Sequence, residues 1–138
     1  MADETTAMPN HGEFCWTEIA STDLEKCRTF YSNVFGWEFK KSEATGEEME
    51  YLEFSSSGEP MGDGALYEMQ AAMFGGNMPP AHIAHYVSVD DVNASVEMAP
   101  QLGGKVVFPP YDIPNVGRMA VIEDPTGAMV SIITLNPM

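Results

Sequence analysis

The chain has 138 residues, 44% of them hydrophobic, which suits one compact domain with its own core. Its 6 Lys and Arg residues against 21 Asp and Glu residues give a formal net charge of −15, so no basic surface is available for nucleic-acid phosphates or an anionic membrane. No apolar run approaches the roughly 20 residues that span a bilayer. The sequence therefore predicts a cytoplasmic protein without nucleic-acid or membrane partners.

The N-terminal segment 1–12 includes acidic residues and a proline and lacks the apolar stretch of a signal peptide, so we expect a flexible N-terminus. The two cysteines, Cys15 and Cys27, are too few for a disulfide framework. We expect both to be free thiols that pack as small apolar side chains.

A strand–helix–strand unit follows the N-terminus. Residues 14–19 are aromatic and β-branched, which is typical of a strand. Thr22 with Glu25 in the first turn after it forms a capping box, which predicts the start of a helix. Gly36 suits the position just after the end of that helix, and an extended pattern resumes at residues 37–39.

The same pattern returns later in the chain, with Asp91 in the place of Asp23, and a repeat of this kind indicates a duplicated unit. Residues 83–89 predict a strand, Asp90 is the expected helix N-cap, and Gly104 falls opposite Gly36. Pro100 is expected to kink or shorten the second helix. The apolar face of that helix is predicted at Val92, Val96 and Leu102.

Each copy continues into two further strands, residues 49–54 and 64–70 in the first and residues 118–122 and 128–134 in the second. The two hairpins align when Gly64 is matched with Gly127. We therefore expect an α+β fold with one domain over residues 13–138. It comprises two tandem βαβββ modules, residues 13–70 and 81–136, joined by a linker at residues 71–80.

Several segments resemble the vicinal oxygen chelate superfamily, which includes glyoxalase I, bleomycin-resistance proteins and extradiol dioxygenases. They are residues 16–23, the helix end at residues 30–37 and the Asp-Pro-Thr-Gly-Ala run at residues 124–128. The resemblance covers residues 13–136, and residues 103–107, 112–114 and 117–118 are similar to a bacterial glyoxalase-like subgroup. It implies mixed sheets that curl around a cavity.

The resemblance also implies where a metal ion would bind. Members that use a metal place one ligand on the first and last strand of each module, and the ion acts as a Lewis acid. Counting back from Asp23 and Asp91 places the first-strand positions at Trp16 and Ala84. Counting forward from Gly127 and Gly64 places the last-strand positions at Ser131 and Glu68. Only Glu68 has a ligand side chain, so no metal cofactor is expected.

A weaker alternative for a metal site comes from two histidines close to Ala84. His82 lies shortly before it on the same strand, and His85 directly follows it. In this alternative, one of the histidines and Glu68 hold a divalent ion between them.

Strand alternation places one set of side chains under the helices and the other toward the cavity. A mostly apolar cavity with a few polar groups is typical of a small-molecule site. Trp16 either stacks on a planar ligand or fills the vacated metal position as part of the core. The side chains expected to face the cavity include Trp16, Glu18, Leu66, Glu68, His82, Tyr86 and Ser131.

Three further residues complete the candidate site. Glu68 is the expected catalytic residue, since desolvation would raise its pKa and make it a general base; the alternative is an exposed or Arg118-paired carboxylate. Arg118 either orients a carboxylate of the ligand or bridges to Asp112 or Glu123. Tyr111 lies in the proline-rich segment 109–117, which is either a lid over the cavity or a plain connection.

Three functions remain open at this point. The first is a glyoxalase-like protein that binds a small organic ligand with a degenerate metal site. The second is a metal-dependent lyase, similar to lactoylglutathione lyase, or an extradiol dioxygenase. The third is a binding protein that sequesters an antibiotic or another small molecule without turnover. Whether the chain is an enzyme is left open, and a homodimer is the default assembly.

Overall fold

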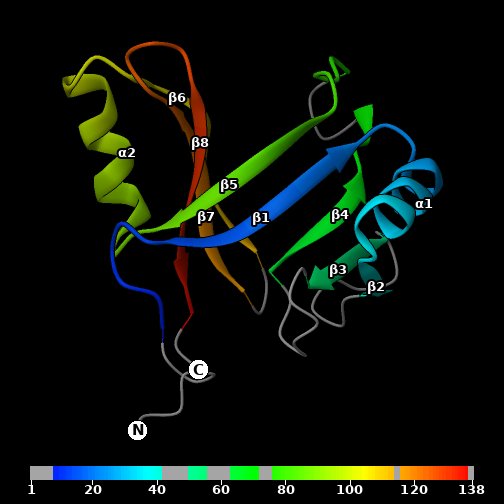
Figure 1. Cartoon of the computed structure of the whole chain (residues 1–138). Helices are drawn as coiled ribbons and strands as arrows, with labels where there is room; N and C mark the ends of the chain where they lie inside the picture. Colours follow the sequence, from blue (N-terminus) through cyan, green and yellow to red (C-terminus); the bar gives the residue numbers. More distant parts are fainter. Residues whose placement is uncertain (1–7, 42–49, 56–62, 72–75, 114–115, 137–138) are drawn as a thin grey trace, which may run out of the picture. The chain divides into compact units, whose positions relative to one another are not determined.

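The computed structural model describes residues 8–41, 50–55, 63–71, 76–113 and 116–136. The elements follow in the order β1 (Phe14–Ser21), α1 (Leu24–Phe35), β2 (Glu38–Lys41), β3 (Tyr51–Ser55), β4 (Gly64–Glu68), β5 (His82–Ser88), α2 (Val92–Gln101), β6 (Lys105–Ile113), β7 (Gly117–Glu123) and β8 (Met129–Leu135). The predicted α+β fold and the doubled βαβββ order are confirmed (Figure 1). Neither described helix has the length and apolarity that crossing a lipid bilayer requires.

The chain divides into two compact units. Residues 17–83 form the α1 unit, and residues 1–16 with 84–138 form the α2 unit. The α1 unit has the strand order β2-β3-β4-β1, with β1 and β4 parallel and the other neighbours antiparallel. The α2 unit repeats this with β6-β7-β8-β5, in which β5 and β8 are parallel. The last strand of each repeat therefore lies beside the first.

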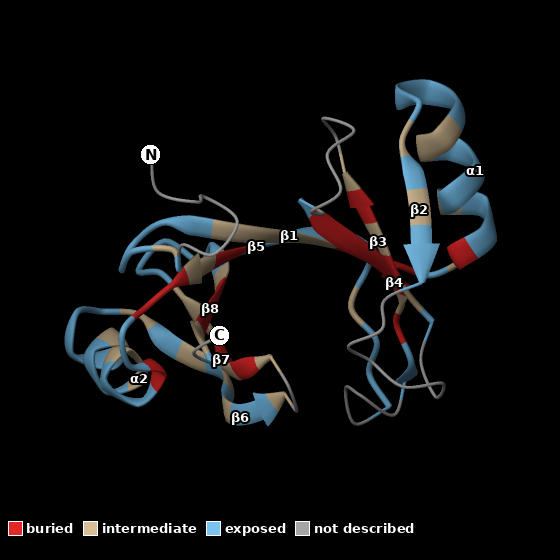
Figure 2. Ribbon diagram, turned by 90° about the horizontal axis from the view of Figure 1, so that it is seen from below, coloured by how far each residue is buried: buried red, intermediate tan, exposed pale blue. Residues whose placement is uncertain are grey.

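The core of the α1 unit lies between α1 and its sheet. Ile19 of β1 and Leu66 of β4 are paired in the ladder and point to the same face, where they pack with Leu24 of the helix. Figure 2 shows β4 as a mainly buried strand and α1 as a mainly exposed helix with a buried start. Ile19 under the helix agrees with the predicted alternation, whereas the expectation that Leu66 faces away from the helix is wrong.

The α2 unit has an equivalent core. Val87 of β5, Ala120 of β7 and Ile132 of β8 pack against Val92 and Val96 of α2. Leu102, which was predicted on the same helical face, is instead the C-cap and is 69% exposed. The helix ends at Gln101, directly after Pro100, since proline removes a helical hydrogen bond.

Both helix caps lie one position later than predicted. Asp23, not Thr22, is the N-cap of α1, and its carboxylate accepts a hydrogen bond from the amide of Lys26. Asp91, not Asp90, caps α2 by accepting from the amides of Asn93 and Ala94. A carboxylate accepts from an amide N–H more strongly than a hydroxyl does, which favours Asp23 over Thr22. The repeat alignment equates Asp23 with Asp91, and these two residues are the observed N-caps. The alignment of the two helix starts is therefore correct.

The C-terminal ends of the helices differ from the predicted alignment as well. Gly36 follows α1 with the left-handed φ of 76° that favours glycine, as predicted. In the second repeat the left-handed residue is Gly103, with φ of 93°, and not Gly104. A Cβ on Gly104 would lie 2.4 Å from the carbonyl oxygen of Glu123, so this glycine permits a close approach of two backbones.

The alignment of the two hairpins by Gly64 and Gly127 is wrong. Gly127 sits in a tight turn with φ of 99°. Gly64 instead begins β4 against β1, where a Cβ would lie 1.8 Å from the carbonyl oxygen of Thr17. The ladders give the true correspondence. Ala20 pairs with Tyr67 and its repeat equivalent Ser88 pairs with Ile133, so Tyr67 corresponds to Ile133.

The proline-rich segment expected to be a lid or a connection belongs mostly to a strand. Residues 109–113 continue β6, which pairs with β7 as far as the ladder pair of Ile113 and Gly117. The pairing shifts register twice, between Val106 and Phe108 and between Phe108 and Tyr111, and the second shift spans two prolines, which cannot donate to a ladder. Residues 114 and 115 lie outside the described part of the chain.

A side chain from the last strand of each repeat binds the start of the helix. The Glu68 carboxylate accepts a hydrogen bond of 2.9 Å from the amide of Leu24, the first residue of α1. At the equivalent place, Thr134 Oγ1 accepts from the amide of Val92 at 3.0 Å and donates to the carbonyl of Val89. These bonds satisfy amides at the helix N-termini that have no partner within the helix.

Replacing Glu68 tests this bond. We expect Glu68→Ala to lower the free energy of unfolding by about 1 kcal/mol, since it removes both the acceptor and the charge at the helix N-terminus. Glu68→Gln keeps the acceptor oxygen and is expected to lose less than half of that. Urea unfolding measures both, and equal losses for the two variants would contradict this role.

Asp124 provides a pH-dependent test of the β7–β8 turn. Hydrogen bonds from the Thr126 hydroxyl and from backbone amides, with Thr126 contributing most, hold the pKa of Asp124 below its ordinary value of 3.8. Because the folded pKa is depressed, the stabilisation is complete above pH 3.8 and is lost as the pH falls through the folded pKa. The stability difference between the wild type and Asp124→Ala, measured by urea unfolding, is therefore expected to shrink in acid; a pH-independent difference would contradict it.

Candidate functional site

The face of the α2-unit sheet that does not carry α2 is apolar and well packed. Tyr86, Met119 and Ile133 are buried together there, each at most 5% exposed. The Tyr86 hydroxyl donates to the sulfur of Met119 at 3.5 Å. Cys15 and Trp16, at the start of β1, pack against this cluster. We call this surface the open face of the α2 unit, and Tyr86 lies on it as predicted.

Two serine hydroxyls are buried in this open face. Ser131 is 5% exposed and Ser88 is 6% exposed. Ser131 pairs with Tyr86, Ser88 pairs with Ile133, and strand alternation points both serines to the same side as those two residues. Neither hydroxyl forms a hydrogen bond with any residue in the described part of the chain. Most buried hydroxyls in proteins are satisfied, so this pair is unusual.

Trp16 occupies one edge of the same face. It is half-buried and packs against the cluster of Tyr86, Met119 and Ile133, which agrees with a Trp that fills core space. The residue as a whole stays partly accessible. Burial raises the pKa of the neighbouring Cys15 thiol, which therefore stays protonated at neutral pH and packs as an apolar group.

The corresponding face of the α1 unit carries a carboxylate among aromatic rings. Glu18 Oε2 accepts a hydrogen bond of 2.7 Å from the hydroxyl of Tyr51. Tyr51 also packs on the buried cluster of Ala20, Tyr67 and Met69. Glu18 is placed away from the helix as predicted. Sequence reasoning did not single out Tyr51 as a site residue. The available signal was an aromatic residue within the predicted strand at residues 49–54.

Glu68, the predicted general base, lies at a different place from the open faces. Its carboxylate accepts from the amide that begins α1, so it is on the helix side of the sheet. The prediction depended on the hairpin alignment, which equated Glu68 with Ser131. With the register given by the ladders, the equivalent of Ser131 is Ala65. Glu68 is instead the equivalent of Thr134, and both residues bind a helix N-terminus.

The corrected register changes the donor set for the implied metal ion. The first-strand and last-strand positions are Trp16, Ala65, Ala84 and Ser131. These side chains offer one hydroxyl and no carboxylate, imidazole or thiolate, which does not fit a divalent ion. Among the described residues, no three His, Cys, Asp or Glu side chains come together as a metal-binding group.

The two histidines near Ala84 have other neighbours. His82 Nδ1 lies 2.8 Å from the carbonyl oxygen of Pro80, and because a carbonyl can only accept, this nitrogen carries the proton. The ring of His85 packs edge-on against Phe14, with ring centroids 5.8 Å apart. Both side chains are exposed. Neither contact brings a histidine to Glu68.

Arg118 and Tyr111 belong to the pairing of β6 with β7. Arg118 forms a 3.0 Å ion pair with Asp112 and also donates to the side chain of Asn93 at 3.0 Å. The bridge to Asp112 was one of the two predicted alternatives, and it is confirmed. Tyr111 is 44% exposed and its ring packs near that of Phe108. These contacts join both residues to neighbours on β6 and α2.

The sequence matches one protein-family model and is similar to several bacterial proteins. The family model of the Glyoxalase/Bleomycin resistance protein/Dioxygenase superfamily matches residues 14–132. The protein named "Putative glyoxylase CFP32" of Mycobacterium tuberculosis is 34% identical over 134 residues, which cover 94% of this chain and 50% of that protein. "Anthracycline biosynthesis protein DnrV" of Streptomyces peucetius is 29% identical over 88% of this chain and 46% of that protein. The chain spans about half the length of these two relatives.

Solved structures show the same fold at low sequence identity. Methylmalonyl-CoA epimerase from Mycobacterium tuberculosis has a TM-score of 0.55 at 15% identity, covering 91% of this chain and 89% of that chain. An extradiol ring-cleaving dioxygenase from B. fuscum has a TM-score of 0.60 at 19% identity, covering 96% of this chain and 35% of that chain. At these identities the likeness concerns the fold alone. Through its doubled βαβββ order and the family match, the chain belongs to the Glyoxalase/Bleomycin resistance protein/Dioxygenase superfamily.

Proposed function

We propose that this chain binds a small organic molecule on the open face of the α2 unit and that it does so without a resident metal ion. The observation that carries the proposal is the pair of buried hydroxyls, Ser88 and Ser131, which have no hydrogen-bond partner among the described residues. A buried polar group left unsatisfied costs about 1–3 kcal/mol. A ligand with a polar atom at this face would recover part of that cost.

The surroundings of the two serines favour a ligand that is mostly apolar. The partly buried Ile113, Val121 and Leu135, which pack on the buried Tyr86 cluster, supply the apolar surface, and the half-buried Trp16 supplies an aromatic ring. Apolar walls with a few polar groups are the usual composition of small-molecule sites. Stacking on an indole would add about 0.5–1.5 kcal/mol beyond the burial of area.

The donor set argues for binding in preference to metal-assisted chemistry. A lyase or a dioxygenase of this superfamily that works through a metal needs carboxylate or imidazole ligands. Trp16, Ala65, Ala84 and Ser131 stand at the four strand positions, and Glu68 binds the start of α1. A protein that binds or sequesters its ligand is therefore the form of the proposal that this chain's residues support best.

The names of two relatives suggest which ligand class to test first. "Anthracycline biosynthesis protein DnrV" and "Anthracycline biosynthesis protein DauV" are 29% and 28% identical to this chain. A planar aromatic compound matches the stacking surface of Trp16, so an aromatic natural product is the first candidate class.

Fluorescence titration with the anthracycline daunorubicin tests the proposal. We expect Trp16→Ala to weaken binding about ten-fold by loss of stacking, and Ser131→Ala to weaken it about five-fold by loss of one hydrogen bond. The drug is cationic and the chain is strongly acidic, so the titration is run in high salt to suppress non-specific attraction.

Glu68→Gln is the matched control, because it changes a carboxylate that the open face does not include. Its affinity is expected to equal that of the wild type. Binding that survives Trp16→Ala and Ser131→Ala but fails in Glu68→Gln would contradict the proposed site.

Metal content provides a separate test. Elemental analysis of tag-free protein, dialysed against Ni, Zn, Mn and Fe, is expected to show far less than one ion per chain, because the four strand positions lack ligand side chains. Near-stoichiometric metal that falls in Glu68→Gln would overturn the metal-free part of the proposal.

A further inference from the structure

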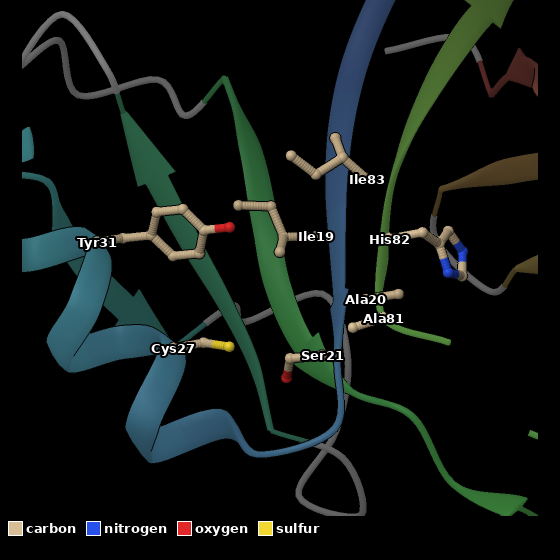
Figure 3. A pocket seen from close by; sticks show the side chains of 8 residues that line it. All are labelled: Ile19, Ala20, Ser21, Cys27, Tyr31, Ala81, His82 and Ile83. Atoms are coloured by element: carbon tan, nitrogen blue, oxygen red, sulfur yellow. The ribbon is translucent and has the colours of Figure 1, made fainter. Parts of the chain in front are cut away.

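A pocket of about 220 Å³ lies within the α1 unit, between α1, β1 and the start of β5 (Figure 3). Its wall is formed by Ile19, Ala20 and Ser21 of β1, by Cys27 and Tyr31 of α1, and by Ala81, His82 and Ile83 at the start of β5. None of these residues lies on the open face of the α2 unit. The pocket is therefore a separate candidate site on the helix side of β1.

The side chains around this α1 pocket point in two directions. Figure 3 shows Tyr31 and Cys27 reaching from the helix toward β1, where Ile19 and Ser21 face them. His82 and Ala20 point to the other side of their strands. Strand alternation explains this division, because Ile19 and Ser21 share one face of β1 and Ala20 lies on the other.

The lining of the α1 pocket offers apolar surface and neutral polar atoms. Ile19, Ala81 and Ile83 are aliphatic, and Ser21 uses its hydroxyl to donate to the carbonyl of Tyr67. The hydroxyl of Tyr31 and the thiol of Cys27 remain as polar atoms, and Cys27 forms no disulfide. Among the described residues, no Lys, Arg, Asp or Glu side chain lines the pocket, and the imidazole of His82 points to the other side of its strand. A charged ligand would have no counter-charge here.

Tyr31 is held in place by a stack of aromatic rings. Its ring lies on Trp37 with centroids 5.5 Å apart, and Trp37 lies on the buried Phe54 with centroids 4.5 Å apart. Phe35 also stacks on Tyr31 at 6.0 Å. A wall fixed in this way loses little freedom when a ligand binds, which favours affinity.

We propose that the α1 pocket binds an uncharged aromatic molecule of one ring that carries a hydroxyl group. The pocket exceeds the roughly 150 Å³ that accommodates benzene in an engineered apolar cavity. The ring would pack between Ile19, Ile83 and the edge of Tyr31, and its hydroxyl would bond to the Tyr31 hydroxyl. The net charge of −15 and the neutral lining both disfavour anions.

Alkylation of Cys27 measures occupancy of the α1 pocket directly. In a Cys15→Ala background, Cys27 is the single thiol, and its reaction with iodoacetamide is followed by mass spectrometry. With p-cresol as the probe we expect a Kd of about 0.1–1 mM, given its small number of atoms. At about ten times Kd, the alkylation rate should fall about ten-fold. Benzoate, a charged probe of similar size, should leave the rate unchanged.

Two variants with a control separate pocket binding from other effects. Ala81→Phe fills the pocket and is expected to abolish protection by p-cresol. Ala94→Phe places the same side chain on an exposed position of α2 and should retain protection. Tyr31→Phe keeps the ring, loses the hydroxyl and should weaken p-cresol about five-fold. Thermal unfolding confirms that each variant is folded.

The outcomes decide the proposal whichever variants fold. Protection of Cys27 by p-cresol but not by benzoate, lost in Ala81→Phe or weakened in Tyr31→Phe, supports it. No protection of the folded parent at about 5 mM p-cresol overturns it, since that exceeds the expected Kd. Equal protection by benzoate, or unchanged protection in Ala81→Phe, also overturns it. Daunorubicin binding by the α2 unit is read separately, so failure of one proposal leaves the other intact.

Discussion

The parallel pairing of the first and last strand of each repeat is the constraint from which the other features follow. It places β4 beside β1 and β8 beside β5, although the paired positions, such as Ile19 with Leu66, lie far apart in the chain. The pairing fixes which side chains face the helix and which face away, because alternation leaves no freedom once the register is set. It also brings Glu68 and Thr134 to the starts of α1 and α2, where each binds a backbone amide.

The sequence predicts the elements well because their signals are local. Apolar spacing, a capping residue near each helix start and the turn at residues 124–127 each act over a short stretch of chain, so the doubled βαβββ order is correct. Each N-cap prediction is wrong by one position, since neighbouring polar residues compete for that role and only the local geometry selects Asp23 and Asp91.

The register of the strand pairs is harder to predict from sequence than the elements are. That register determines which residues occupy the candidate site. Aligning Gly64 with Gly127 assumes that the two glycines have one role, whereas one permits close strand contact and the other a left-handed turn. This misalignment moved Glu68 onto a ligand position that Ala65 occupies. The positions given to Trp16 and Ser131 are unchanged by the ladders, because their offsets run from a helix start and from the Asp-Pro-Thr-Gly turn, which the structure retains. The α1 pocket had no sequence signal, since it depends on how α1 packs on β1.

The two tryptophans are distributed one to each unit. Trp37 is stacked between Tyr31 and Phe54 in the α1 unit, whereas Trp16 packs on the Tyr86 cluster of the α2 unit. Stacking on other rings and contact with a methionine-containing cluster give the two indoles different surroundings. Each indole is therefore an internal spectroscopic label for its own unit, and replacing either one with phenylalanine leaves a reporter for whether the two units unfold together or in sequence.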